Sequence, residues 1–248
     1  MIHEVINIAK AASVEILKIY SLPKCNFDLK EDLSPITEAD IKSNEIIISG
    51  LKKISNYPIL TEESLVGYNE RKTWNKYWLV DPLDGTKGFI DRDGGFTVNI
   101  ALIENNQPIL GVVYIPVSND VFYAEKGKGA LKNGSIIFNN SKRVNLIGAD
   151  SVHHSTKGVH QFFKKNNITN IQKIGSSIKI CKLAEGVIDV YPRLNGTSEW
   201  DTAASHIIAN EAGCKLIDIE TKTEISYNKK NLRNNYFIAS KNNLNFYI

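Results

Sequence analysis

The sequence predicts a mixed α/β protein in which layers of helices alternate with layers of sheet. Two amphipathic helices open the chain, an antiparallel run of strands follows, and short strands then alternate with helices after about residue 147. Elements of this kind bury their apolar faces against one another in layers. The 248 residues are enough for a substantial core, so we expect one functional unit, 1–248, with lobes at approximately 1–147 and 148–248.

The N-terminal segment predicts two helices. Apolar residues recur on a 3.6-residue period from residue 2 to 20, and the pattern ends near Pro23. Residues 41–54 form a second amphipathic segment. Asp40 falls at its first turn, where a carboxylate is favourable.

The middle of the chain predicts an antiparallel meander. A short strand is expected at 58–60, and KYWLVDPLDGT (76–86) is the strongest strand-to-turn signal. Pro82 has no N–H, so we expect strand pairing to end right after Asp81. Three further strands are expected, followed by a hairpin at GKGALKNG (127–134); the strands are 96–103, 108–115 and 120–124.

The C-terminal part predicts short strands that alternate with helices. Strand-like pieces are VNLIGAD (144–150) and NIQKIGS (170–176), and helices are expected at 160–166, 177–186 and 201–213. Asp201 begins the last of these helices, where it would be a good N-cap.

The composition is that of a globular protein. Hydrophobic residues make up 42% and charged residues 23%, and the net charge of +3 is too small to indicate nucleic-acid binding. Three widely spaced cysteines, Cys25, Cys181 and Cys214, do not suggest a disulfide framework. We expect them to be buried thiols in a reducing compartment.

The N-terminal segment lacks the pattern of a secretory signal, and no window approaches the roughly 18 apolar residues of a membrane-spanning helix. We therefore expect a cytoplasmic protein. A peripheral contact with the cytoplasmic face of the inner membrane stays open, as does the choice between monomer and homodimer.

Carboxylates recur at the ends of apolar segments, at Asp40, at Glu62-Glu63, at Asp81 with Asp84, and at Asp201. Each has an ordinary explanation as a cap, turn or solvated loop. Together they favour a cation site, because two carboxylates and the Leu83 carbonyl at one strand end would otherwise repel. Oxygen ligands without His or Cys favour Mg²⁺, with Mn²⁺ as a substitute.

The residues that follow suit an anion. Gly85 lets a phosphate approach the backbone, and the N–H groups of Gly85 and Thr86 are placed to cradle it. The Thr86 hydroxyl can orient a water. The stretch therefore predicts metal-assisted hydrolysis of a phosphate ester.

Three motifs resemble the inositol monophosphatase superfamily of Mg²⁺-dependent, lithium-sensitive phosphatases. They are TEES (61–64), DPLDGT (81–86) and WDTAASHIIANEAG (200–213), and they occur in the family's order. The resemblance covers essentially the whole chain and implies an αβαβα sandwich with the active site between the lobes. It also implies two or three Mg²⁺ ions, whose ligands would be Glu62, Asp81, Asp84, Asp201 and the carbonyl of Leu83.

The resemblance further implies catalytic roles. Thr86 and Glu62 would position the attacking water, and Gly85 and Thr86 would hold the phosphate. Asp40, in TEAD (37–40), resembles an acid that reaches the metal through water and helps to deprotonate the nucleophile. The substrate would also contact the metal ligands Glu62, Leu83, Asp84 and Asp201.

Within this superfamily, the chain resembles the 3′(2′),5′-bisphosphate nucleotidase branch. Lys87 follows DGT, and GSSIKICKLAEGVIDVYPR (175–193), FTVNIALI and PILGVVYIP match the same branch. The implied substrate is adenosine 3′,5′-bisphosphate, cleaved to AMP and phosphate, with phosphoadenylyl sulfate as a further substrate. Ser176, Lys179 and Arg193 match positions that contact the nucleotide and its 5′-phosphate.

Other assignments remain open. Lys179 can also be explained as a solvated helix residue, and His154 lies near where nucleotidases sometimes place a histidine by the base. Gly95 stands where the branch usually has an acid. The alternative function is an inositol monophosphatase or a fructose-1,6-bisphosphatase. A non-catalytic nucleotide-binding module would require a broken ligand set, and this set is intact.

Overall fold

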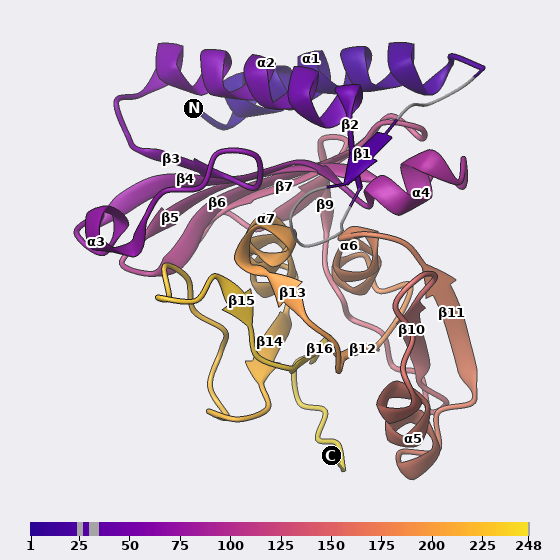
Figure 1. The fold of residues 1–248 in the computed structure, drawn as a ribbon. Helices are drawn as coiled ribbons and strands as arrows, with labels where there is room; N and C mark the ends of the chain where they lie inside the picture. Colours follow the sequence, from indigo (N-terminus) through magenta and orange to yellow (C-terminus); the bar gives the residue numbers. More distant parts are fainter. Residues whose placement is uncertain (24–26, 30–34, 248) are drawn as a thin grey trace.

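Five layers build the molecule (Figure 1). The computed structural model describes residues 1–23, 27–29 and 35–247. An outer pair of helices covers a large sheet, a second pair of helices separates that sheet from a smaller one, and one more helix lies beyond the smaller sheet. This order of layers confirms the predicted αβαβα sandwich.

The outer helices are α1 (Ile2–Tyr20) and α2 (Glu38–Ile54). They bury one apolar stripe each against the large sheet, with Val5 and Leu51 fully enclosed. The bounds of α1 confirm the prediction. α2 begins three residues earlier than predicted, because Thr37 caps it and the side chain of Asp40 bonds back to the Thr37 backbone.

The large sheet has seven strands in sequence order, β3-β4-β5-β6-β7-β8-β9. β3 is parallel to β4, and every later neighbour is antiparallel. The predicted meander and the hairpin at 127–134 are confirmed. The strands are β3 (Ile59–Thr61), β4 (Lys76–Asp84), β5 (Thr97–Glu104), β6 (Gln107–Ile115), β7 (Asp120–Glu125), β8 (Ala130–Lys132) and β9 (Ser135–Ile137), and two short helices, α3 (Tyr68–Arg71) and α4 (Thr86–Ile90), border them.

The prediction that Pro82 ends strand pairing is wrong. Asp81 pairs with Asn99, and pairing resumes where Asp84 meets Thr97, with a bulge between them. A bulge tolerates a proline because its residues are outside the ladder. Residues three apart on a regular strand face opposite sides. The bulge turns Asp81 and Asp84 to the same side, because their partners Asn99 and Thr97 are two residues apart.

The inner helices are α6 (Ile178–Ala184) and α7 (Glu199–Glu211). They share a core with one face of the large sheet and with the smaller sheet. α7 lies directly on β6 at Gly111, where an added Cβ would be 2.3 Å from the carbonyl oxygen of Ala204. Glycine is therefore required for this spacing between helix and sheet.

The smaller sheet has the order β11-β10-β12-β16-β14. β10 is parallel to β11 and β12, and β16 is antiparallel to β12 and β14. Helix α5 (Lys157–Lys165) begins three residues before its predicted start and packs on this sheet. The strands are β10 (Ile147–Ser151), β11 (Asn170–Ile174), β12 (Val190–Arg193), β14 (Cys214–Asp218) and β16 (Phe237–Lys241). Two strand pairs complete the fold, β1 (Phe27–Leu29) with β2 (Pro35–Thr37) and β13 (Thr197–Ser198) with β15 (Arg233–Asn234).

Three smaller predictions have clear outcomes. Asp201 is not the N-cap of α7, because Ser198 caps the helix and Asp201 is its third residue. Cys181 and Cys214 are buried free thiols, as expected, whereas Cys25 lies outside the described residues. The division into lobes near residue 147 stays a prediction.

Among residues 1–23, 27–29 and 35–247, none of the helices combines the length and the hydropathy that a membrane span requires.

Candidate active site

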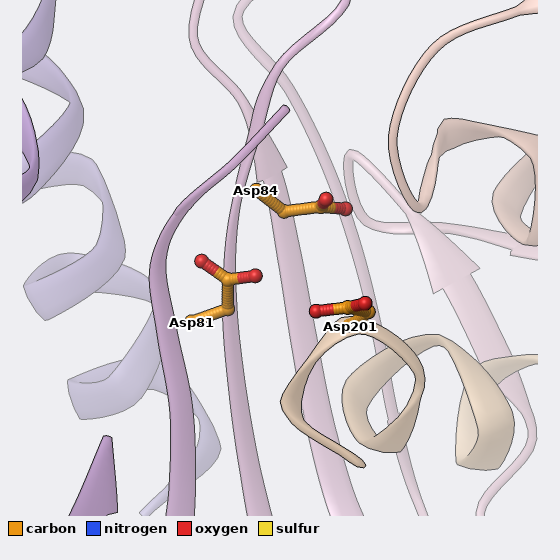
Figure 2. Close-up of side chains that lie close together, drawn as sticks. All are labelled: Asp81, Asp84 and Asp201. Atoms are coloured by element: carbon orange, nitrogen blue, oxygen red, sulfur yellow. The ribbon is translucent and has the colours of Figure 1, made fainter. Parts of the chain in front are cut away.

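Three carboxylates converge between the large sheet and the inner helices. Asp81 and Asp84 come from β4, and Asp201 comes from the first turn of α7. Figure 2 shows the three side chains pointing toward one another. Each offers an oxygen within 4.8 Å of an oxygen of the other two, a spacing that could hold a metal ion.

The electrostatics of this cluster favour a cation. Burial raises the pKa of Asp81 well above its ordinary value, and the nearby Glu62, Asp84 and Asp201 raise it further. Burial and the charge of Asp84 likewise raise the pKa of Asp201 to about 8. Carboxylates held this close repel one another when ionised. The donor set contains oxygen atoms alone, so it fits a hard divalent cation.

Asp40 and Asp201 occupy equivalent positions in two helices. Oδ2 of Asp40 accepts from the backbone N–H of Thr37 at 2.8 Å, and Oδ2 of Asp201 accepts from the backbone N–H of Ser198 at 2.9 Å. Each acid is the third residue of its helix and closes a capping box. Their first-turn positions also place negative charge where the helix dipole favours it.

Thr86 links Asp40 to the cluster. Its hydroxyl lies 3.2 Å from Oδ1 of Asp40 and 3.3 Å from the carbonyl oxygen of Leu83. Asp40 itself is buried and does not line the cavity, so it would reach that space through Thr86.

Glu62 and Gly85 complete the edge of the cluster. The N–H of Glu62 donates to Val80 at 3.1 Å, which fixes the residue beside β4. Gly85 has a φ of 91°, in the left-handed region, and an added Cβ would lie 2.8 Å from the carbonyl oxygen of Gly95. Glycine is therefore required at the start of α4.

A cavity of about 510 Å³ opens over these residues. Ten of the residues singled out from the sequence line it: Glu62, Asp81, Leu83, Asp84, Gly85, Thr86, Ser176, Lys179, Arg193 and Asp201. Lys87 and His154 also line it. The structure thus gathers around one space residues that the sequence separates widely.

Basic residues, among them Lys179 and Arg193, also line the cavity. Arg193 is only 8% exposed, and its Nη2 donates to Gly196 at 3.0 Å. Its Nε is buried and has no hydrogen-bond partner in the described part of the chain. A buried unpartnered donor is costly, so this arginine suits an anionic ligand.

Lys179 and His154 lie near this arginine. Nζ of Lys179 donates to the carbonyl oxygens of Ser176 at 2.6 Å and Ile174 at 3.2 Å, and burial lowers its pKa to about 7. Lys179 is buried, so its explanation as a solvated helix residue is wrong. Burial, with the charge of Arg193, lowers the pKa of His154 to about 4, so this ring is neutral near pH 7.

Sequence reasoning missed four polar residues of the site. Thr97, Asn99 and Ser177 form a buried network with Asp84, and Arg233 lines the cavity. A signal was present for two of them, because Thr97 and Asn99 alternate with apolar residues along β5 and must share one face.

The sequence pattern described as the inositol monophosphatase family matches residues 1–246. The chain therefore belongs to the inositol monophosphatase family. Among curated proteins, it is 40% identical over 231 residues to the 3′(2′),5′-bisphosphate nucleotidase CysQ of Salmonella typhimurium, a match that covers 90% of this chain and 92% of the relative. It is 41% identical over 224 residues to the protein of the same name from Buchnera aphidicola, with 87% and 83% covered.

A solved structure supports the same grouping. The crystal structure of CysQ from Bacteroides thetaiotaomicron superimposes on this fold with a TM-score of 0.87 at 38% identity, and the match covers 96% of each chain. That protein is a bacterial member of the inositol monophosphatase family.

Proposed function

We propose that this chain is a Mg²⁺-dependent, lithium-sensitive 3′(2′),5′-bisphosphate nucleotidase. It hydrolyses adenosine 3′,5′-bisphosphate to AMP and phosphate, with phosphoadenylyl sulfate as a further substrate. The observation that carries the proposal is a single cavity lined both by a carboxylate cluster that could hold cations and by a buried arginine. The carboxylate cluster suits cations, and the buried Nε of Arg193 has no acceptor among the described residues. The names of the curated relatives support the nucleotide as substrate.

The chain would hold two or three Mg²⁺ ions, or Mn²⁺ in their place. Their ligands would be Glu62, Asp81, Asp84, Asp201 and the Leu83 carbonyl oxygen, all of which line the cavity. When bound, such ions neutralise the carboxylates, polarise the phosphate and make water a stronger nucleophile.

Thr86 and Asp40 would handle the proton of the attacking water. The Thr86 hydroxyl donates to Asp40, so its own lone pairs are left to accept from a water. As the water loses its proton, that proton can pass through Thr86 to the Asp40 carboxylate. Glu62, at the edge of the cluster, would accept the second hydrogen bond of the same water and fix its direction.

The remaining residues would hold the two phosphates. Gly85 and Thr86, at the start of α4, would donate backbone N–H groups to the scissile phosphate. Arg193 would bind the second phosphate through its unpartnered Nε. Lys179, when protonated, adds positive charge near Arg193. We also expect the chain to act in the cytoplasm as one unit, monomeric or homodimeric.

Phosphate release with Mg²⁺ tests this function. Adenosine 3′,5′-bisphosphate would be compared with adenosine 3′-monophosphate, which is a matched control without the second phosphate, and with inositol 1-phosphate and fructose 1,6-bisphosphate. We expect kcat/KM for the bisphosphate to exceed that for the monophosphate by about tenfold or more, since a charge-assisted hydrogen bond contributes roughly 1.5–3 kcal/mol. Millimolar-scale Li⁺ should inhibit and EDTA should abolish turnover.

The other outcomes are equally clear. Preference for inositol 1-phosphate or fructose 1,6-bisphosphate would keep the metal site and overturn the nucleotide assignment. Equal rates for the bisphosphate and the monophosphate would overturn the role of Arg193. Lack of turnover of every ester would overturn the assignment as a hydrolase.

A further inference from the structure

Several donors converge on one oxygen of Asp84. The Ser176 hydroxyl lies 2.6 Å from Oδ2, and the backbone N–H of Ser177 donates to the same oxygen at 2.7 Å. Nδ2 of Asn99 adds a longer contact at 3.4 Å. These donors come from the turn before α6 and from β5, so two elements fix a single carboxylate oxygen.

The hydroxyl proton of Ser176 can be assigned by counting. Ser176 has one hydroxyl proton, and the 2.6 Å contact with a carboxylate commits it to Asp84. Thr97 has one hydroxyl proton but lies 2.7 Å from the Ser176 oxygen and 2.8 Å from the Ser177 oxygen, so either contact can take that proton. Ser177 donates its own hydroxyl proton to Oδ1 of Asn99 at 2.9 Å. The Ser176 proton therefore runs to Asp84, whichever neighbour receives the proton of Thr97.

The turn that carries these donors is itself held in place. Nζ of Lys179 donates to the carbonyl oxygens of Ser176 and Ile174, on either side of Gly175. Ser176 has a φ of 51°, a backbone conformation that residues other than glycine adopt at a cost. An added Cβ at Gly175 would lie 2.6 Å from the carbonyl oxygen of Gly95, so the turn also packs tightly against the loop that precedes β5.

We propose that Ser176 and Lys179 are positioning residues for Asp84: they fix Oδ2 and leave the other carboxylate oxygen as the cation ligand. This inference rests on the proposed metal-dependent function. It replaces the predicted contact between Ser176 and the substrate, because the single hydroxyl proton of Ser176 is committed to Asp84 and cannot also be donated to a phosphate.

Two alanine variants give a matched test. Ser176→Ala and Ser177→Ala each remove one hydroxyl from the same buried network, but only the first removes a hydrogen bond to Asp84. Ser177 reaches Asp84 through its backbone N–H, which alanine keeps. The probe is Mn²⁺, titrated into the metal-free full chain while the free ion is counted by electron paramagnetic resonance.

We expect Ser176→Ala to weaken Mn²⁺ binding by roughly 10–100-fold, the usual loss when an orienting partner of a ligand is removed. Ser177→Ala should change the Mn²⁺ affinity by less than about threefold, because it leaves the orienting partners of Asp84 in place. With metal supplied in excess, the KM of Ser176→Ala for adenosine 3′,5′-bisphosphate should match that of the wild type.

Lys179→Met gives a test in which a positioning role and a purely electrostatic effect predict opposite changes in Mn²⁺ affinity. Removing a positive charge near a cation site should tighten Mn²⁺ binding by Coulomb's law. A positioning role predicts weaker binding. Lys182→Met is the control, because Lys182, on the same helix, forms a partly exposed ion pair with the C-cap residue Glu185.

The outcomes separate this inference from the proposed function. A wild-type chain that binds no Mn²⁺ would overturn both. Equal Mn²⁺ affinities of Ser176→Ala and Ser177→Ala, or tighter binding by Lys179→Met, would overturn the inference alone. A raised KM of Ser176→Ala with unchanged Mn²⁺ affinity would return Ser176 to a direct substrate contact.

Discussion

At the scale of single residues, two acids of the site combine roles that the sequence presents as alternatives. Asp40 and Asp201 each fit both a helix-capping position and an active-site position. The structure shows that one oxygen of each carboxylate closes a capping box. For Asp40, the other oxygen contacts Thr86. A carboxylate has two acceptor oxygens, so the two explanations do not exclude each other.

The motif residues of the site could be predicted because each lies within a short, recognisable sequence pattern. Glu62, Asp84 and Thr86 lie in segments whose order along the chain is itself informative. The contacts of Ser176 and Arg193 could not be predicted. They depend on which groups the fold brings within 3 Å, and no spacing in the sequence encodes that distance.

The raised pKa values at the site predict a pH-dependent stability for the metal-free chain. Asp201 has a folded pKa of about 8 against an ordinary value of 3.8. Between these values, the folded chain binds more protons at this group than the unfolded chain does. The contribution of Asp201 to the free energy of unfolding therefore falls as pH rises through that window.

Asp201→Asn isolates this contribution, since its amide oxygen can still accept from Ser198. In EDTA, wild type should lose stability relative to Asp201→Asn between pH 5 and pH 8, as measured by urea unfolding. Adding Mg²⁺ at pH 8 should make the wild type more stable than Asp201→Asn. A pH-independent difference between them would contradict the prediction.

At the scale of elements, strong periodic patterns were predictable and local irregularities were not. α1 and the strands of the meander were found because their apolar positions repeat over many residues. The bulge in β4 was missed because it depends on how β5 pairs with it. Strands β12, β14 and β16 were missed because they are short, and short apolar runs do not distinguish strand from helix.

Glu199, the first residue of α7, anchors the loop around Asn228 and Lys229, which lies close to the site. Oε2 of Glu199 accepts from the N–H of Asn228 at 2.7 Å, and Oε1 accepts from the N–H of Lys229 at 3.0 Å. The side chain is fully buried and also pairs with the Lys229 ammonium at 2.8 Å. This loop leads into Arg233, whose Nη1 donates to the α7 cap Ser198 at 3.1 Å.

Glu199→Gln should therefore destabilise the fold by about 2–4 kcal/mol, because the amide NH₂ would face a backbone donor and Lys229 would lose its partner. Glu211→Gln at the other end of α7 is the control. Glu211 also accepts two backbone N–H groups, from Gly127 and Gly129, but it is only partly buried. Glu211→Gln should lower the free energy of unfolding by less than about 1 kcal/mol. Chemical denaturation measures both, and equal losses would show that burial of Glu199 is not decisive.

At the scale of the whole molecule, the site exists only when the layers are assembled. Asp81 and Asp84 belong to the large sheet, Asp201 belongs to an inner helix, and Arg193 lies at the end of a strand in the smaller sheet. The sequence predicted the order of these layers. It did not predict their separations, which follow from side-chain packing.

One of those separations is set by Gly111. Its contact with Ala204 brings α7 onto β6, and Ala204 is one turn along the helix from Asp201. Gly111→Ala should lift the N-terminal part of α7 and move Asp201 away from Asp81 and Asp84. Gly67→Ala is the control, because an added Cβ there meets nothing within 4 Å.

The consequence concerns ion selectivity. Mg²⁺ requires oxygen ligands at about 2.0–2.1 Å in near-octahedral geometry, whereas Ca²⁺ accepts about 2.3–2.6 Å and irregular geometry. A widened site should lose Mg²⁺ affinity and keep or gain Ca²⁺ affinity, so the ratio of the two dissociation constants should shift toward Ca²⁺ in Gly111→Ala. Calorimetric titration of both ions measures that ratio, and an unchanged ratio would contradict the argument. The hydrogen atom that serves as the side chain of one glycine, on a strand that supplies no ligand, would then decide which ion this enzyme accepts.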